Sequence, residues 1–198
     1  MSSLRLPVET STLRLRPFEN GDLDAVARYL TLPSVQRYVE RPARYVEDVA
    51  SSLAVMRKQL ELHRPGDRLT LAMVRKADGM LIGHVSLRWS DATAGQGEVR
   101  FVIDPTFSGR GYLSEALRAL FGIAFDHYHI HRLMVRCDGR SRHSAKLMQT
   151  LGMRIEAHYR EHALFQGEWD EELHFAMLDR EWRPSGTVLD LPRRERVA

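Results

Sequence analysis

The chain has 198 residues, of which 43% are hydrophobic and 28% charged, and its formal net charge is +3 at neutral pH. This composition is typical of a globular protein and excludes disordered and fibrous classes. Basic and acidic residues are interspersed, which argues against a nucleic-acid partner, and no apolar run is long enough to predict a membrane span.

The N-terminus and the cysteine content indicate the compartment. The first eleven residues, MSSLRLPVETS, lack the basic start and apolar block of a secretory signal. Cys137 is the only cysteine, so it cannot form an intramolecular disulfide, and zinc sites built from cysteine pairs are excluded. We therefore expect a cytoplasmic protein.

The first half of the chain predicts a strand, two helices and a β-hairpin. The strand Leu13–Phe18 alternates apolar and polar residues, whereas Leu23–Leu30 and Val46–Leu62 have helical periodicity. Two strands with a period of two follow, Leu69–Val74 and Met80–Leu87, joined through the turn pair Asp78-Gly79.

The second half predicts a parallel strand pair and a terminal hairpin. In order, we expect a strand Glu98–Ile103, a helix from Leu113 through Ala124, a strand Arg132–Cys137, a helix Ser141–Leu151, and strands Arg154–Leu164 and Leu173–Leu178. A strand, helix and strand in succession indicate a right-handed parallel crossover.

The predicted order is thus β-α-α-β-β-β-α-β-α-β-β, which is typical of a single three-layer α/β domain with a mixed central sheet. We assign this domain to residues 1–183. Residues 184–198 follow with a cluster of arginines, and we expect them to form a flexible basic tail.

One short segment carries most of the functional information. In Phe107–Phe125, FSGRGYLSEALRALFGIAF, two glycines flank Arg110 directly before a helix. The first amides of a helix have no intrahelical partner, and glycine lets an anion approach them closely, so this turn is suited to a diphosphate. It lacks the lysine and hydroxyl residue of a nucleoside-triphosphate loop and the three glycines of a dinucleotide fingerprint, so a plain turn is the alternative.

This segment resembles the acetyl-CoA loop and helix of the GNAT N-acetyltransferases, and more narrowly the Rim-type branch that acetylates ribosomal-protein N-termini. The resemblance covers most of the chain. It includes LRLRPF, LIGHVSL, GEVRFVIDP, SRHSAKLMQTLGM, EAHYRE and GEWDEELHFAMLDREW. It implies a GNAT-like fold whose sheet is splayed at the cofactor site, with acetyl-CoA (coenzyme A) as cofactor and an amine as acceptor.

The resemblance also implies which residues hold the cofactor. Main-chain amides of the loop would bind the diphosphate, and the pantetheine arm would lie between Glu98–Ile103 and Arg132–Cys137, where a bulge would free an amide to polarise the acetyl carbonyl. The loop positions are Ser108, Gly109, Arg110, Gly111, Tyr112, Leu113 and Ser114, and the other positions are Phe101, Val102, Ile103, Ser141 and Ser144. Ser108 and Leu113 depart from the family pattern, but neither removes an amide.

Two proton-transfer roles follow from the resemblance. Met148 occupies the position where many GNAT enzymes have a proton-donating tyrosine, and the hydroxyl of Ser144 is the alternative donor to the leaving thiolate. For the base we consider Glu98 first, then Glu161 and His84, with a water chain as the alternative to any direct base.

Several readings remain open or are rejected. The alternating His127, His129 and His131 could face one metal, but the family has a similar linker without one, so we expect no metal. The expected reaction is direct acetyl transfer to a protein N-terminus or a small-molecule amine. The alternatives are a catalytically weak acyl-CoA-binding regulatory module and transfer of a larger acyl group such as succinyl. Homodimers are frequent in the family.

Overall fold

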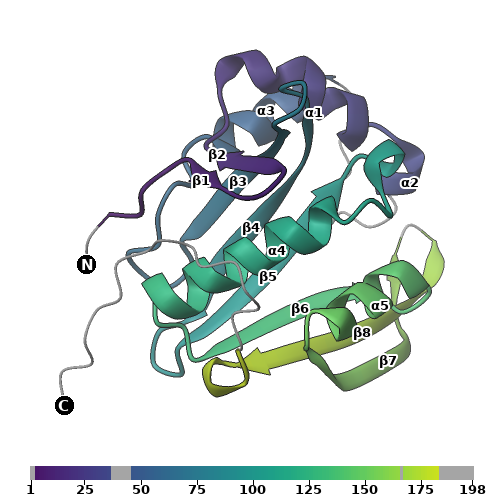
Figure 1. Cartoon of the computed structure of the whole chain (residues 1–198). Coiled ribbons are helices and arrows are strands. Elements are labelled where there is room, and N and C mark those ends of the chain that lie inside the picture. Colours follow the sequence, from purple (N-terminus) through teal and green to yellow (C-terminus); the bar gives the residue numbers. More distant parts are fainter. Residues whose placement is uncertain (1–2, 37–45, 166, 183–198) are drawn as a thin grey trace.

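The computed structural model describes residues 3–36, 46–165 and 167–182, and Figure 1 draws the whole chain. The strands are β1 (Val8–Glu9), β2 (Leu13–Arg16), β3 (Arg68–Arg75), β4 (Leu81–Asp91), β5 (Gln96–Ile103), β6 (Arg132–Asp138), β7 (Arg154–Phe165) and β8 (Glu168–Leu178). The α-helices are α1 (Leu23–Leu30), α2 (Pro33–Gln36), α3 (Val46–Met56), α4 (Tyr112–Gly122) and α5 (Arg142–Thr150). A π-helical segment, Ile123–His127, extends α4.

The predicted order of elements is confirmed, and the structure adds the two-residue strand β1 and the one-turn helix α2. The described strands form one mixed sheet in the order β1-β2-β3-β4-β5-β6-β8-β7. Only β5 and β6 run parallel, and α4 forms the crossover between them. The proposed tail, residues 184–198, lies outside the described residues.

The second predicted helix is shorter than expected, because α3 ends at Met56 and not at Leu62. Beyond it, the main-chain oxygen of Gln59 accepts a hydrogen bond from the Thr70 amide at 2.8 Å, and its Oε1 accepts one from the Thr70 hydroxyl at 2.6 Å. Because β2 pairs only with Ala72–Arg75 of β3, this segment takes over the edge of the sheet where β2 has ended.

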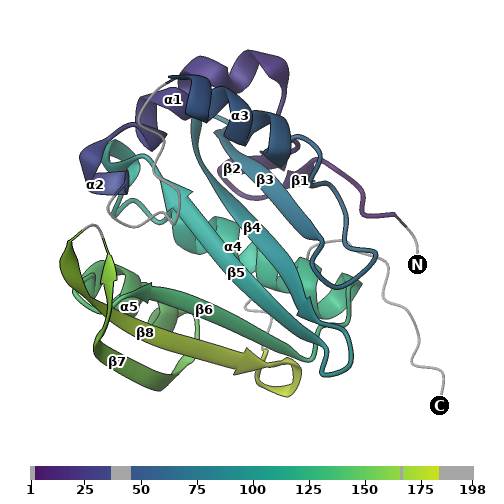
Figure 2. The ribbon, with the colours of Figure 1, turned by 180° about the vertical axis from the view of Figure 1, so that it is seen from behind.

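Helices cover the two faces of the sheet unequally. Helices α4 and α5 pack on one face, the α4/α5 face, over a large core that includes Leu71, Val85, Val99 and Val135. Helices α1 and α3 pack on the opposite α1/α3 face over a smaller core around Ala72 and Val74. Figure 2 shows that α1 and α3 lie over one end of β3 and β4, and that no described helix lies over β6 and β8 on that face. The described helices are each too short or too polar to serve as a membrane span.

The parallel strands β5 and β6 separate part-way along their length. Their pairing runs from Gln96 opposite Arg132 to Val99 opposite Val135 and then stops. Beyond that level β5 remains paired with β4, and β6 remains paired with β8. The divergence of the two ribbons is visible in Figures 1 and 2. The splay expected from the sequence resemblance is therefore confirmed.

Gly83 allows β4 and β5 to lie close together beside this splay. A Cβ on Gly83 would lie 2.3 Å from the main-chain oxygen of Val102 and 2.9 Å from the Cα of Ile103, and both obstacles are backbone atoms that cannot move aside easily.

We therefore predict that Gly83→Ala lowers the free energy of unfolding by about 3 kcal/mol, because the added methyl group must displace a strand. Chemical denaturation measures the loss. Gly21→Ala is the matched control, because a Cβ at Gly21 meets no atom within 4 Å. Equal stability of the two variants would show that β5 can shift without cost.

Candidate active site

The glycine-flanked turn forms an open cradle of amides at the start of α4. Gly109 and Gly111 have φ angles of +74° and +85°, and Gly111 is the N-cap residue of α4. An added Cβ at either glycine would meet no atom within 4 Å, so the cradle is open to a ligand. The Ser108 amide donates to Pro105 and the Glu115 amide to Gly111. Among the described residues, the amides of 109–114 donate to no protein acceptor.

The turn is anchored on its N-terminal side by Asp104. This carboxylate is buried and accepts hydrogen bonds from the amide of Thr106 at 3.0 Å and from its hydroxyl at 2.7 Å. Arg28 of α1 also donates to it at 3.1 Å. Burial raises the pKa of Asp104, but the bonds from Thr106 and Arg28 outweigh burial and lower it overall. The ionised carboxylate therefore fixes the turn to the α1/α3 layer.

Two arginines hold the ring of Phe107, which immediately precedes the turn. The guanidinium carbon of Arg75 lies 5.0 Å from the ring centroid and that of Arg110 lies 5.7 Å from it. Both distances are within the range of cation–π attraction. Arg75 also pairs with Asp78 in the β3–β4 turn, so that turn is tied to the loop. Glu115, the acidic residue of the first turn of α4, accepts hydrogen bonds from the main-chain amide and the hydroxyl of Thr12, both at 2.7 Å.

Every second main-chain amide of β5 faces the space where β6 has separated from it. The amide of Asp104 donates to Ile82 on the β4 side, and successive residues of a strand direct their main-chain groups to opposite sides. The Val102 amide therefore faces β4, whereas the amides of Phe101 and Ile103 face the gap that β6 has left. The prediction of a bulge in β5 was wrong, because β4 and β5 pair in unbroken register from Gly97 to Ile103. The separation of β5 from β6 exposes the main-chain amides instead.

Helix α5 begins where β6 ends and carries the predicted proton donor in its first turn. Ser141 is the N-cap residue, and its Oγ accepts a hydrogen bond from the Ser144 amide at 3.4 Å. The hydroxyl of Ser141 donates to the Ser144 Oγ at 3.0 Å. The hydrogen of the Ser144 hydroxyl can then donate elsewhere. Met148 is fully buried in the large core.

Glu98 forms ion pairs with three arginines, which come from three neighbouring strands. Its Oε1 accepts hydrogen bonds from Arg136 at 2.8 and 3.2 Å and from Arg100 at 3.0 Å, and Arg88 lies 3.7 Å from its Oε2. Its side chain is only 4% exposed. Burial raises the pKa of Glu98, but the arginines outweigh it and lower the pKa below its usual value. Such a carboxylate is a poor proton acceptor.

His84 and Glu161, the other two candidate bases, lie in different surroundings. His84 is on the α1/α3 face of β4 opposite Val102, and its Nδ1 is 2.8 Å from the hydroxyl of the fully buried Tyr29. Burial lowers the pKa of His84 to about 4, with Arg68 adding to the effect, so the ring is neutral at neutral pH. Glu161 is exposed, in an irregular part of the edge strand β7 where its φ is +50°. Strands β6 and β8 separate it from β5.

Comparison with known proteins identifies this combination of loop and splay. A profile of the acetyltransferase (GNAT) domain matches residues 12–154, which is most of the chain. The chain belongs to the GNAT acetyltransferase family. The uncharacterized N-acetyltransferase YnaD of Bacillus subtilis is 26% identical over 178 residues, which are 88% of this chain and 98% of that protein. The [Ribosomal protein uS5]-alanine N-acetyltransferase of Escherichia coli is 24% identical over 127 residues, which are 63% of this chain and 64% of that enzyme.

Solved structures agree with this assignment. The acetyltransferase (GNAT family) of Bacillus anthracis superposes with a TM-score of 0.77 at 23% identity, covering 88% of this chain and 99% of that one. The predicted GNAT family and fold are thereby confirmed. Relatives named as ribosomal-protein N-acetyltransferases agree with the predicted Rim-like branch. Enzymes of this family take their acyl group from acetyl-CoA. In this GNAT acetyltransferase, the amides of 109–114, which donate to no acceptor in the described part of the chain, are a set of donors that suits a diphosphate.

Sequence reasoning missed two residues of this GNAT acetyltransferase, Arg100 and Arg136. They follow the last paired level of β5 and β6 directly, so they flank the start of the splay on the α1/α3 face. Cys137 also lies on the separated part of β6. Burial raises the pKa of Cys137 to about 11, with Asp138 and Glu172 adding to the effect, so its thiol is protonated at neutral pH and is not a nucleophile.

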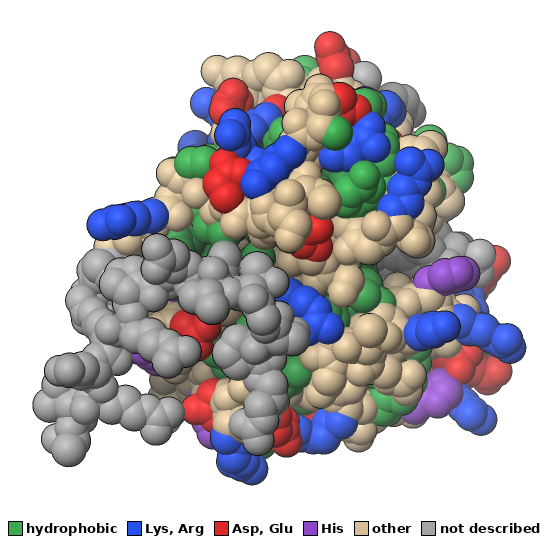
Figure 3. All heavy atoms as spheres, in the orientation of Figure 1, with side chains coloured by type: hydrophobic (Ala, Val, Ile, Leu, Met, Phe, Trp, Pro, Cys, Tyr) green, Lys and Arg blue, Asp and Glu red, His purple; other side chains and the backbone are tan. Residues whose placement is uncertain are grey.

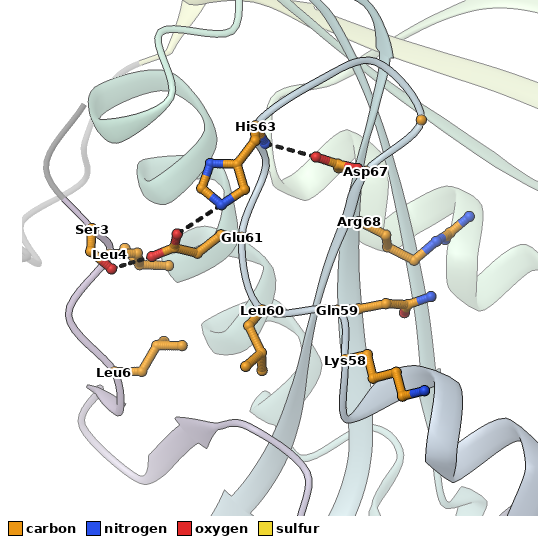
Figure 4. Close-up of a pocket in the computed structure, with 11 residues that line it drawn as sticks. Ser3, Leu4, Leu6, Lys58, Gln59, Leu60, Glu61, His63, Asp67 and Arg68 are labelled. Carbon is orange, nitrogen blue, oxygen red and sulfur yellow. Dashed lines mark hydrogen bonds and ion pairs between the residues drawn. The ribbon is translucent and has the colours of Figure 1, made fainter.

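A pocket of about 650 Å³ lies away from the splay, between the N-terminal segment and the α3–β3 connection. Figure 4 shows its polar rim, where His63 pairs with Glu61, and the main-chain amide of His63 donates to Asp67. Its lining comes from residues 3–6 and 58–68, and none of the residues that carry the family resemblance at the cofactor loop takes part. We therefore assign no acyl-transfer role to this pocket.

The surface charge is mixed. On the face seen in Figure 3, basic and acidic side chains are interspersed.

Proposed function

We propose that this GNAT acetyltransferase transfers an acetyl group from acetyl-CoA directly to a primary amine, either a protein N-terminus or a small-molecule amine. One observation carries the proposal: β5 separates from β6 beside a cradle of amides that donate to no acceptor among the described residues. The Escherichia coli relative that acts on ribosomal protein uS5 favours a protein N-terminus as the acceptor.

In this proposal the cradle at Ser108–Ser114 binds the diphosphate through main-chain amides, and Arg110 adds a full positive charge. When bound, acetyl-CoA supplies an acetyl group activated as a thioester. The amides of Phe101 and Ile103 face the gap and can donate to a carbonyl oxygen held there. Because α4 and its core fill the α4/α5 face, an acceptor amine reaches the gap from the α1/α3 face.

The acceptor needs only a weak base. Arg100 and Arg136 lie at the start of the gap, and Glu98 pairs with both of them, so this carboxylate is not available as the base. An N-terminal amine already has a pKa of about 8 in free peptides. We therefore propose that water accepts the proton and that Glu98 orients the arginines.

Binding and turnover can be tested separately. Acetyl-CoA at about 100 times its Kd is expected to stabilise the fold by about 2.7 kcal/mol, seen as a rise in Tm. Release of free CoA with a panel of amines, monitored by a thiol reagent, measures turnover, and acetyl-CoA compared with succinyl-CoA decides the acyl group. No thermal shift at millimolar acetyl-CoA would contradict the proposal.

A non-catalytic acyl-CoA-binding module is the second candidate. The buried Met148 favours it, because this side chain stands where many relatives place a tyrosine and cannot donate a proton. Binding of acetyl-CoA without CoA release across the amine panel would support this candidate over the enzyme.

Ser144 is proposed to donate a proton to the departing thiolate. We predict that Ser144→Ala lowers kcat about 100-fold, because a general acid contributes at least that much, and leaves the Kd for acetyl-CoA within about twofold. Thr150→Ala, at the other end of α5, removes a hydroxyl that bonds only to the main chain of its own helix and serves as the control. An unchanged kcat for Ser144→Ala would remove the assigned role.

A further inference from the structure

The buried hydroxyl of Tyr29 has a single hydrogen-bond partner among the described residues, the imidazole of His84. The hydroxyl oxygen lies 2.8 Å from the Nδ1 atom of His84. Tyr29 of α1 is fully buried, so water does not provide an alternative acceptor. A buried hydroxyl whose hydrogen has no acceptor is costly, and the Tyr29 hydroxyl must therefore donate to Nδ1.

This hydrogen bond fixes the tautomer of His84. A neutral imidazole carries one hydrogen, and because Nδ1 acts as an acceptor, that hydrogen is on Nε2. The ring is neutral near pH 7, since burial lowers the pKa of His84 to about 4. His84 thus presents an N–H donor at Nε2 and has no lone pair there. In this tautomer it suits hydrogen-bond donation and not proton abstraction.

The Nε2 atom of His84 is open to solvent. It has no hydrogen-bond partner in the described part of the chain, and it is not one of the buried polar atoms that lack a partner there. The ring is nevertheless held firmly. Its centroid lies 6.0 Å from that of Phe18, edge-on, and 5.9 Å from that of Tyr29. The direction of the donor is therefore set before a ligand arrives, which reduces the entropic cost of binding.

His84 also lies beside the splay. It is opposite Val102 of β5, and the amides on either side of Val102, those of Phe101 and Ile103, face the gap. The imidazole is on the α1/α3 face, from which the proposed acceptor enters. Neighbouring strands lie about 4.8 Å apart, a distance that an imidazole side chain spans. An acceptor whose amine is in the gap can therefore place an oxygen atom over β5, within reach of Nε2.

We propose that His84 donates a hydrogen bond from Nε2 to the carbonyl oxygen next to the acceptor amine, and that Tyr29 is a positioning residue that holds this tautomer. The acceptor is then an α-amino carbonyl compound, such as a peptide N-terminus or an amino-acid amide. Alkylamines and polyamines have no oxygen to accept this bond and are poor acceptors. The inference rests on the proposed function, since it names the acceptor class of the same site.

The first test compares a short peptide with its thioxo analogue, in which sulfur replaces the oxygen of the first carbonyl. Sulfur accepts hydrogen bonds weakly, whereas the free amine is retained. We expect kcat/KM to be about tenfold higher for the oxo peptide, mainly through a lower KM, because one hydrogen bond is at stake. Spermidine and propylamine should be poorer than the oxo peptide as well. Equal kcat/KM for the two peptides, or a preference for spermidine, would overturn the inference.

Variants assign the difference to His84. His84→Leu should bring the ratio of oxo to thioxo kcat/KM close to one, whereas His84→Gln, whose amide nitrogen can stand near the Nε2 position, should retain part of it. Tyr29→Phe removes only the hydroxyl, so a lower ratio there would reflect the lost tautomer control. His63→Leu, at the pocket away from the splay, is the control and should keep the full ratio. A full ratio in His84→Leu would contradict the inference.

A spectroscopic test needs no turnover. Nitrogen-15 NMR of the wild-type protein near pH 7 should show the hydrogen of His84 on Nε2, with the signal assigned by its absence in His84→Gln. Tyr29→Phe should shift the ring toward a mixture of tautomers. A hydrogen on Nδ1 in the wild type would overturn the inference.

The two proposals can fail separately. Fluorescence anisotropy measures peptide binding without turnover, and the oxo peptide should bind more tightly than the thioxo peptide. If it does so and the tautomer is as expected, but no CoA is released, the proposed function alone is contradicted. If CoA is released at equal rates with both peptides, this inference alone is contradicted.

Discussion

Replacement of Gly111 by aspartate is expected to weaken CoA binding by at least about 100-fold, or about 2.8 kcal/mol. Two physical effects combine. Gly111 has a φ of +85°, which costs a residue with a Cβ about 1–2 kcal/mol. The new carboxylate would also lie at the amides that we propose as the diphosphate site, where it repels the ligand and competes for the donors.

The matched control is Gly66→Asp. Gly66 has a φ of +96° and open space around it, so the substitution imposes similar strain and adds the same charge, but in the α3–β3 connection. Calorimetric titration with CoA should show wild-type affinity for Gly66→Asp and almost none for Gly111→Asp. Wild-type affinity in the Gly111 variant would mean that the diphosphate binds elsewhere, and the roles assigned around the loop would lose their basis.

Local sequence patterns predicted most of the fold because local physics determined it. The Asp78-Gly79 pair requires a left-handed residue, and Gly79 has a φ of +71° in the β3–β4 turn. The change from helical to alternating periodicity placed β3 to β5 within two residues or so of their observed ends, although β4 extends further, to Asp91. The loop before α4 could be predicted for the same reason, since its glycines and the following amides act within one short segment.

The parts that failed depend on contacts between distant segments. The length of α3 was overestimated because Gln59 pairs with Thr70 of β3, a partner that periodicity cannot indicate. The environment of Glu98 was also missed, because its arginines come from three strands whose register is set only when the sheet forms. An acidic residue that begins a strand gives no sign of whether the fold will leave it available or bind it in ion pairs.

The environment of Glu98 leads to a second prediction with a large expected effect. Glu98→Gln should lower the free energy of unfolding by about 3 kcal/mol, because it leaves three converging guanidinium groups without their buried counter-ion. Glu156→Gln is the matched control, since Glu156 also pairs with two arginines but is 30% exposed. Solvent screens that pair, so the control should lose less than about 1 kcal/mol.

The pH dependence of this effect has a definite sign. The pKa of Glu98 is lower in the folded protein than in the unfolded chain, so its contribution is complete above the unfolded value of about 4.3 and is lost as the pH falls through the folded value. The stability difference between wild type and Glu98→Gln should therefore stay constant near neutrality and narrow on acidification below about pH 4.3.

The same variant separates a structural role from a catalytic one. If Glu98 orients Arg88, Arg100 and Arg136, kcat of the folded variant should fall by less than about tenfold, while its stability declines. If Glu98 were the base, turnover should fall about 100-fold or more with little loss of stability. Denaturation curves and steady-state kinetics on one preparation decide between these outcomes, because an ion-paired carboxylate with a lowered pKa cannot be both a firm counter-ion and an effective proton acceptor.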